Sequence, residues 1–331
     1  MCFSRSINNT KLKNKKGENI MAKYTKKQVI ALFLDSINYP CKIKENDEYP
    51  GYMTYNFNIL DVQKFHKEML SAGFLRNADF EDIVCRYRVN ELRDIAQKYN
   101  VEFNKCKKEK LIENLINNLS EEVKRKIVND SGFYVLSDKA IKYLKEYKHL
   151  IKFYRYKDDL SSFTCDEYLK YANQFPKSYS ENDVFWGALN TQLIKSHKDH
   201  LFELGRCTYL SMGKFMLSEN KKTNALYYFI LTMWIDMNQP YLQEKILEGR
   251  NGWIEKDPIA PGIVRWIYEN KDYYRSNMID KIYENQYLPV VIIDKTTFRN
   301  MIEDIFNSSI FDEEKYNNIS YFETKRKFKI E

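Results

Sequence analysis

The chain contains very few of the residues that interrupt helices. Among its 331 residues are only 10 glycines and 7 prolines, whereas 44% of the residues are hydrophobic and 15% are aromatic. All-β folds need frequent turns, which Gly and Pro usually provide, so this composition favours helices. The apolar content is sufficient for a buried core and excludes disorder of the whole chain. We therefore expect a mainly α-helical protein, and its length predicts two compact domains.

Two short segments in the first half of the chain nevertheless have the pattern of strands. Residues 54–58 alternate between polar and apolar side chains, and residues 133–136 form a short apolar run. Helices are predicted beside them at 25–37, capped by Thr25, at 61–72, capped by Asp61 and ended by Gly73, and from Ser137 or Asp138 to about 149. These elements predict a small N-terminal α+β scaffold, residues 21–83 and 120–157, into which a further unit is inserted.

The second half of the chain predicts helices. Residues 158–182 are polar and aromatic and contain Pro176, so we interpret them as a linker. A C-terminal α-helical domain, residues 183–331, is expected to follow. Its helices are predicted at 183–197, 200–218, 222–237, 259–270, 276–286 and 295–307.

Residues 204–237 of this domain combine large and small residues in a particular order. The first predicted helix has two large apolar residues and a small one, Tyr209, Met212 and Gly213, and the second has a small residue and an aromatic one, Ala225 and Phe229. This pattern resembles one tetratricopeptide repeat. Because a solenoid repeat needs neighbours to cover its apolar face and only one unit is visible, the resemblance implies a helical hairpin in a tetratricopeptide-like bundle.

Between the two parts of the scaffold lie two amphipathic segments joined by a basic loop. The first segment, residues 86–101, has one helical stripe of apolar or small residues, namely Val89, Leu92, Ile95, Ala96 and Tyr99. The loop, residues 102–108, is followed by a second helix at 109–116. Over residues 86–129, eleven Lys or Arg stand against seven Asp or Glu, a net charge of +4. We expect a small helix–loop–helix module with a basic surface.

This module resembles the SAP domain over residues 84–119. The resemblance rests on Val89, Glu91-Leu92-Arg93, Ala96, Val101, Lys107-Lys108, and Leu111-Ile112 with Leu115. The flanking residues further resemble SAP-domain-containing proteins of phages and prophages. The resemblance implies binding of DNA, with a preference for AT-rich or distorted duplex.

The chemistry of the module agrees with DNA binding. Lysines at the start of the second helix place positive charge beside free backbone amides, and both groups contact phosphate. An array of Asn or Gln suited to base edges is lacking, so we expect weak sequence specificity. The candidate DNA-binding residues are Arg86, Arg88, Arg93, Lys98, Lys105, Lys107, Lys108 and Lys110.

Two other interpretations of the module remain. Its lysines are also compatible with a solvated surface on a purely structural unit, or with a protein–protein interaction adaptor that does not bind DNA. In the DNA-binding interpretation, the C-terminal helical domain contacts a protein partner or associates with itself. Salt-dependent DNA binding discriminates between these classes.

Neither a catalytic motif nor a metal site is predicted. His197, His200 and Cys207 are close in sequence, but their spacing fits no standard zinc motif. Asp294 follows an apolar run, as carboxylates of metal-dependent nucleases do, but the partner residues of such a site are missing. Asp294 or Thr296 instead suits the cap of the next helix. We therefore expect a non-enzymatic protein that uses no cofactor.

The first 20 residues differ from the rest, since they carry a net charge of +4 out of the total of +7. Residues 15–21 read like a translated ribosome-binding site before a start at Met21, so we interpret residues 1–20 as a misread, disordered leader. The alternative is a basic arm. The six cysteines form no close pair, and no apolar run reaches the length of a membrane span. These features predict a cytoplasmic protein with no membrane association.

Overall fold

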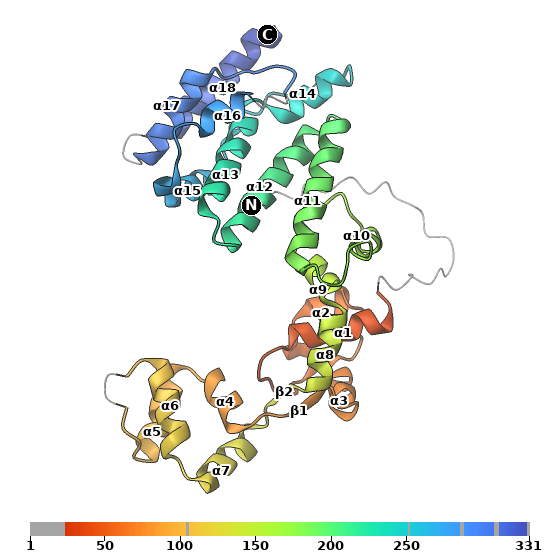
Figure 1. Cartoon of the computed structure of the whole chain (residues 1–331), viewed down its shortest axis with the longest axis vertical. Coiled ribbons are helices and arrows are strands. Elements are labelled where there is room, and N and C mark those ends of the chain that lie inside the picture. The colour runs from red at the N-terminus through yellow and green to blue at the C-terminus, as the bar shows by residue number, and fades with distance from the viewer. Residues whose placement is uncertain (1–23, 104–105, 251, 285–287, 308–310, 330–331) are drawn as a thin grey trace. The chain divides into compact units, whose positions relative to one another are not determined.

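The computed structural model describes residues 24–103, 106–250, 252–284, 288–307 and 311–329. These residues contain eighteen α-helices and one two-stranded sheet (Figure 1). The expectation of a mainly α fold with a small β element is therefore confirmed. The described residues up to Tyr154 form one compact unit, and those from Arg155 onward form another. We call them the N-terminal and C-terminal units. The proposed leader, residues 1–20, lies outside the described residues.

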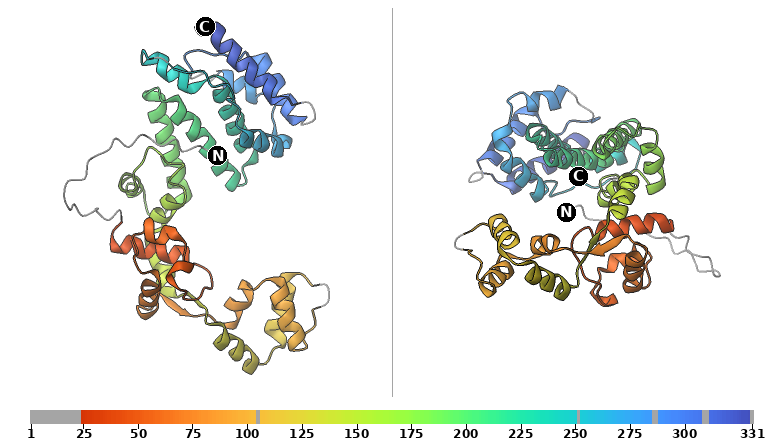
Figure 2. Two further views of the ribbon diagram at one scale, coloured as in Figure 1. Left: turned by 180° about the vertical axis from the view of Figure 1, so that it is seen from behind. Right: turned by 60° about the horizontal axis from the view of Figure 1, so that its bottom comes forward.

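The N-terminal unit consists of a scaffold and four helices that interrupt it. The scaffold elements are α1 (Lys26–Ser36), the 3-10 helix η1 (Asn46–Glu48), α2 (Gly51–Tyr55), α3 (Val62–Ser71), β1 (Leu75–Asn77), β2 (Tyr134–Leu136), α8 (Asp138–Glu146) and α9 (Lys148–Arg155). The interrupting helices are α4 (Phe80–Arg86), α5 (Val89–Lys98), α6 (Lys108–Asn118) and α7 (Glu121–Ser131). Both views of Figure 2 show α4–α7, coloured orange to olive, as one group.

The two strands bring the ends of the α4–α7 segment together. They are antiparallel, with Leu75 opposite Leu136 and Asn77 opposite Tyr134. Tyr134 also forms a backbone bridge to Cys41, with N–O distances of 3.0 and 2.8 Å. The chain therefore leaves the scaffold through β1 and returns through β2, and the segment that follows α1 lies beside this connection.

The boundaries of the scaffold helices follow their capping residues. The side chains of Thr25, Asp61 and Ser137 accept hydrogen bonds from backbone N–H groups in the first turns of α1, α3 and α8. Gly73, just after α3, has a φ of 74°, which glycine adopts without steric cost. These predicted helix starts and this predicted helix end are confirmed.

The prediction of a strand at residues 54–58 is wrong. Residues 51–55 form α2, and the antiparallel partner of β2 is β1, which the sequence did not predict. Phe57 is buried in a turn after the helix, where its backbone N–H donates to the carbonyl oxygen of Tyr52 at 3.3 Å. The polar–apolar alternation of this segment therefore does not mark a strand. The one described sheet consists of β1 and β2 and does not include these residues.

All the secondary-structure elements described in the C-terminal unit are helices. Its elements are α10 (Cys165–Ala172), α11 (Glu181–Lys198), α12 (Phe202–Ser218), α13 (Lys222–Met237), α14 (Pro240–Leu247), α15 (Pro261–Glu269), the 3-10 helix η2 (Lys271–Tyr273), α16 (Met278–Glu284), α17 (Lys295–Phe306) and α18 (Glu313–Phe328). All six predicted helices are present, with boundaries within two residues. Three helices of this unit, α10, α14 and α18, were not predicted from the sequence. Of these, α10 lies inside the expected linker 158–182. Of the helices in the described ranges, none combines the length and the apolar character needed to span a bilayer.

The hairpin of α12 and α13 depends on one close contact. A Cβ atom at Gly213 of α12 would lie 2.6 Å from Cε1 of Phe229 on α13. The ring of Phe229 also stacks on Trp266 of α15, with centroids 5.2 Å apart. Phe229 therefore has little freedom to move away, and glycine at position 213 sets the distance between the two helices. The helical hairpin expected at 204–237 is present, while its resemblance to a tetratricopeptide repeat stays a prediction.

We expect Gly213→Ala to lower the free energy of unfolding by about 1–3 kcal/mol because of overpacking. This outcome opposes helix propensity, which favours alanine over glycine by about 1 kcal/mol. Gly262→Ala in α15 is the matched control, since a Cβ there meets nothing within 4 Å, and it should leave stability unchanged or raise it. Urea unfolding of the full chain measures both. A Gly213→Ala variant as stable as the parent would contradict the packing argument.

A buried histidine lies in the scaffold core. His66 of α3 is 0% exposed, and its ring packs edge-on against Phe33 with centroids 5.5 Å apart. Its Nδ1 lies 2.7 Å from the hydroxyl oxygen of Tyr49, while its Nε2 has no hydrogen-bond partner among the described residues. Burial lowers the pKa of His66 to about 4. The scaffold therefore folds around a neutral imidazole.

Acid should therefore destabilise the scaffold. The pKa of His66 is about 4 in the folded state and about 6.5 in the unfolded state, so between these values only the unfolded state gains a proton. The stabilisation is complete above pH ~6.5 and is lost as the pH falls to about 4, a change of about 3 kcal/mol. Hydrogen exchange of the α1 and α3 amides across this range measures the loss. A His66→Leu variant should show a shallower pH dependence, and an unchanged slope would exclude His66 as its cause.

Candidate nucleic-acid interface

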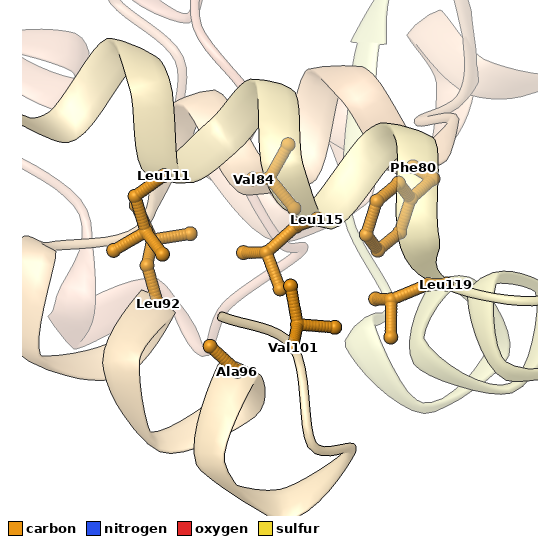
Figure 3. Close-up of a cluster of buried hydrophobic side chains, with 8 residues drawn as sticks. All are labelled: Phe80, Val84, Leu92, Ala96, Val101, Leu111, Leu115 and Leu119. Carbon is orange, nitrogen blue, oxygen red and sulfur yellow. The ribbon is translucent and has the colours of Figure 1, made fainter. Parts of the chain in front are cut away.

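Helices α4, α5 and α6 enclose one small apolar core. Figure 3 shows Leu92 of α5 facing Leu111 of α6, with Leu115 beside Val101. The buried members of this core are Phe80, Val84, Leu92, Ala96, Val101, Leu111, Leu115 and Leu119. Partly buried residues of α7, among them Ile127 and Val128, pack against it. The helix–loop–helix predicted over residues 84–119 thus shares its core with α4 and α7, and we call the whole α4–α7 group the module.

One lysine fixes the start of α6 against the end of α4. The Nζ of Lys108 donates a hydrogen bond to the backbone oxygen of Cys85 at 3.0 Å. Cys85 belongs to the last turn of α4, where unpaired carbonyls carry partial negative charge and favour a cation. The ammonium group of Lys108, one of the predicted DNA-binding residues, is therefore used inside the module.

The same bond gathers three other predicted residues at one end of the module. Arg86 is the last residue of α4, Arg88 is the N-cap of α5, and Lys107 is the N-cap of α6. Arg86 follows Cys85 and Lys107 precedes Lys108, so the contact between Cys85 and Lys108 brings them close. All three side chains are exposed, and none forms an ion pair with a described residue. We call Arg86, Arg88 and Lys107 the basic cluster.

The start of α6 adds backbone donors to the basic cluster. Among the described residues no side chain caps this helix, and the helix dipole favours an anion at its first N–H groups. Glu109, in the first turn, opposes this effect. The start of α5 differs, because the Oε2 of Glu91 already accepts a hydrogen bond from the backbone N–H of Arg88 at 2.6 Å. An anion is therefore favoured at α6 rather than at α5.

Two predicted residues on α5 lie away from the basic cluster. An α-helix turns by about 100° per residue, so Arg93 and Lys98 project about 140° apart, on opposite flanks of the buried Leu92. Lys98 ends the helix, roughly 15 Å along its axis from Arg88. The structure does not bring these two side chains together with the basic cluster.

The last two predicted residues also do not join the basic cluster. Lys110 lies on α6 about 200° around the helix from Lys108, and its Nζ is 3.0 Å from Oε2 of Glu113. Lys105 lies outside the described residues. Of the eight predicted residues, the structure therefore gathers Arg86, Arg88, Lys107 and Lys108 at one end of the module.

Sequence reasoning missed basic residues that the scaffold adds beside this end. Lys42 and Lys44 lie in the segment that follows α1, for which the sequence predicts neither a helix nor a strand. The backbone bridge of Cys41 to Tyr134 carries this segment to the module, where the Arg86 guanidinium lies 5.2 Å from the ring centroid of Tyr39. The only local signal is the Lys-x-Lys spacing, which is ordinary for an exposed loop.

His197 and Asp294 have structural roles in the C-terminal unit. The Nε2 of His197 lies 3.0 Å from the hydroxyl oxygen of Tyr209, and burial lowers the pKa of His197. Asp294 accepts hydrogen bonds from Thr297 and Thr296 at the start of α17, which lower the pKa of its carboxyl group. The predicted capping role of Asp294 is confirmed. The described part of the chain has no group of three His, Cys, Asp or Glu side chains placed to hold a metal ion.

Comparisons of the chain with protein-family models, with curated proteins and with solved structures find no match. The SAP and tetratricopeptide resemblances therefore stay predictions.

Adjacent lysines should differ in their effect on stability. Lys108→Met removes the hydrogen bond to Cys85 and should lower the stability of the module by about 1 kcal/mol. Lys107→Met is the matched control and should stay within about 0.5 kcal/mol of the parent, because the side chain of Lys107 is exposed. Hydrogen exchange of the α6 amides reports both values. Equal effects of the two substitutions would show that Lys108 does not hold α6 in place.

Proposed function

We propose that the protein binds DNA through the basic cluster of its N-terminal unit. The observation that carries this proposal is the contact of Lys108 with Cys85, which places the end of α4, with Arg86 and the following Arg88, beside the start of α6, preceded by Lys107. Exposed cations without ion-pair partners, together with backbone N–H groups at a helix start, are the groups that contact phosphate. The resemblance of residues 84–119 to the SAP domain implies the same ligand.

The proposed binding is electrostatic and has little sequence specificity. Arginine can hold phosphate in a bidentate manner, and two of the three side chains in the basic cluster are arginines. Such contacts position DNA without reading its bases. The preference for AT-rich or distorted duplex, implied by the SAP resemblance, belongs to this proposal as well, because shape and deformability can be read through the backbone alone.

The C-terminal unit has the second role in this proposal, as a helical bundle that contacts a protein partner or a second copy of the chain. This part rests on the tetratricopeptide resemblance. The exposed Ile194 and Phe322 add little to it, since single apolar side chains are common on protein surfaces. The alternative is an adaptor that binds only proteins.

Charge reversal of the basic cluster should weaken DNA binding strongly. We expect the triple variant Arg86→Glu, Arg88→Glu, Lys107→Glu to flatten the log–log salt dependence of duplex affinity by about 2.7, or about 0.9 per lost phosphate contact. The melting temperature should change little, because these side chains are exposed. Fluorescence anisotropy of a labelled duplex at several salt concentrations measures the slope.

The matched control for this experiment is the triple variant Arg93→Glu, Lys98→Glu, Lys110→Glu. It changes the net charge equally at positions away from the basic cluster, so it should retain most of the slope. Equal effects of both triple variants would mean that net charge, not the basic cluster, governs binding. Wild-type protein that does not bind duplex in a salt-dependent manner would leave the protein-interaction adaptor as the better proposal.

A further inference from the structure

A cleft lies beside the basic cluster, within the N-terminal unit. Its volume is 770 Å³, and it is lined by the segment that follows α1, by the connection of α4 to α5, and by Phe133 before β2. This volume is within the range of about 300–1,000 Å³ that small-ligand pockets have. A short stretch of a single strand is a ligand of a size that such a cleft can hold.

The charges that line the cleft favour an anion. Four cations, Lys42, Lys44, Arg86 and Arg88, face it, and none of them forms an ion pair with a described residue. The lining also contains two carboxylates, but both are engaged with backbone N–H groups. Glu48 accepts from Glu45 at 3.1 Å and Glu91 accepts from Arg88 at 2.6 Å. Because both carboxylates keep their charge, the four cations leave the lining with a net charge of +2, which favours an anion.

Two of the four cations, Lys44 and Arg86, lie near the buried Cys41. Burial raises the pKa of Cys41 to about 11, and the charges of Lys44 and Arg86 act in the opposite direction. Both charges therefore lie near this one thiol, although they come from segments more than forty residues apart. Cys41 itself is buried and stays protonated at neutral pH, so it neither neutralises the cations nor acts as a nucleophile.

Aromatic rings alternate with these cations. The Nζ of Lys42 lies 5.0 Å from the ring centroid of Phe133, and the Arg86 guanidinium lies 5.2 Å from that of Tyr39. Tyr87 meets Phe133 edge-on, with centroids 6.5 Å apart. These ring contacts hold Lys42 and Arg86 in place before a ligand binds, which reduces the conformational entropy lost on binding. Tyr39 remains 48% exposed, so its ring is accessible to a base.

We propose that this cleft binds an unpaired segment of a DNA strand, with its phosphates on Lys42, Lys44 and Arg86 and a base on Tyr39. A positively charged groove combined with accessible aromatic rings is the arrangement that binds single strands without sequence preference. Paired bases are stacked inside a duplex and cannot use such a ring. The inference rests on the proposed function, since it takes DNA as the ligand, and Arg86 and Arg88 belong to both surfaces. The cleft would then select DNA in which duplex and single strand meet.

The test uses the full chain and three labelled probes, namely oligo(dT), a blunt duplex, and the same duplex with an oligo(dT) overhang. Tyr39→Ala should weaken oligo(dT) binding by at least about fivefold, because base stacking on an aromatic ring is lost. The double variant Lys42→Gln, Lys44→Gln should reduce the salt slope for oligo(dT) by about 1.4, or about 0.7 per phosphate. Both variants should weaken binding of the blunt duplex far less than binding of oligo(dT), because the basic cluster holds the duplex, and the parent should prefer the overhang probe.

Matched controls separate the cleft from general effects on charge and surface. Tyr55→Ala removes a tyrosine of the same unit that is 86% exposed and lies outside the cleft. Lys98→Gln with Lys110→Gln removes two charges outside the cleft. Neither control should change oligo(dT) binding beyond about twofold, and Tyr39→Phe, which keeps the ring, should bind as the parent does. Thermal melting confirms that each variant is folded.

The two proposals fail in different ways. Duplex binding without oligo(dT) binding, or oligo(dT) binding that the Tyr39 and Lys42/Lys44 variants leave unchanged, overturns the cleft proposal and leaves duplex binding standing. Oligo(dT) binding that depends on the cleft, without duplex binding by the basic cluster, supports the cleft proposal and overturns the proposed duplex function. A chain that binds none of the three probes overturns both.

Discussion

The antiparallel pairing of β1 with β2 holds together the parts of the N-terminal unit that form the candidate interface. Each strand has only three residues, and a two-stranded sheet of this size is marginally stable in water by itself. Here Leu75 and Val135 are buried, so packing against the scaffold and the module stabilises the sheet. The backbone bridge from Tyr134 to Cys41 then extends the pairing to the segment after α1. Without it, Lys42 and Lys44 would have no fixed position relative to Arg86.

Within the module, the position of the charges depends on helix ends more than on the charged side chains themselves. The small core sets the packing of α4, α5 and α6, and the bond from Lys108 to Cys85 aligns the start of α6 with the end of α4. Arg86, Arg88 and Lys107 then project from helix termini, where the backbone has unpaired donors or acceptors. A change in the core would therefore displace the basic cluster without altering its charge.

The helices could be predicted where apolar periodicity and capping residues agree, as at α1 with Thr25 and at α3 with Asp61. They could not be predicted where the buried face is polar. On α18, Asn317, Ser320 and Thr324 are buried, so the helix shows no apolar stripe. Asn317 accepts from the backbone N–H of Ile259 at 3.2 Å, and Ser320 donates to a backbone oxygen at 2.9 Å. Such bonds to distant backbone groups satisfy a buried polar face, but they leave no local signal.

The candidate interface was predictable only in part, for a related reason. Local charge predicted Arg86, Arg88 and Lys107 as candidates, and the structure places each of them at a helix end. It could not separate Lys107 from Lys108, since two adjacent lysines look alike until the position of Cys85 is known. It also could not find Lys42 and Lys44, whose proximity to Arg86 depends on a strand pairing between distant segments. Composition thus states how much charge a surface carries, whereas long-range backbone pairing decides which charges act together.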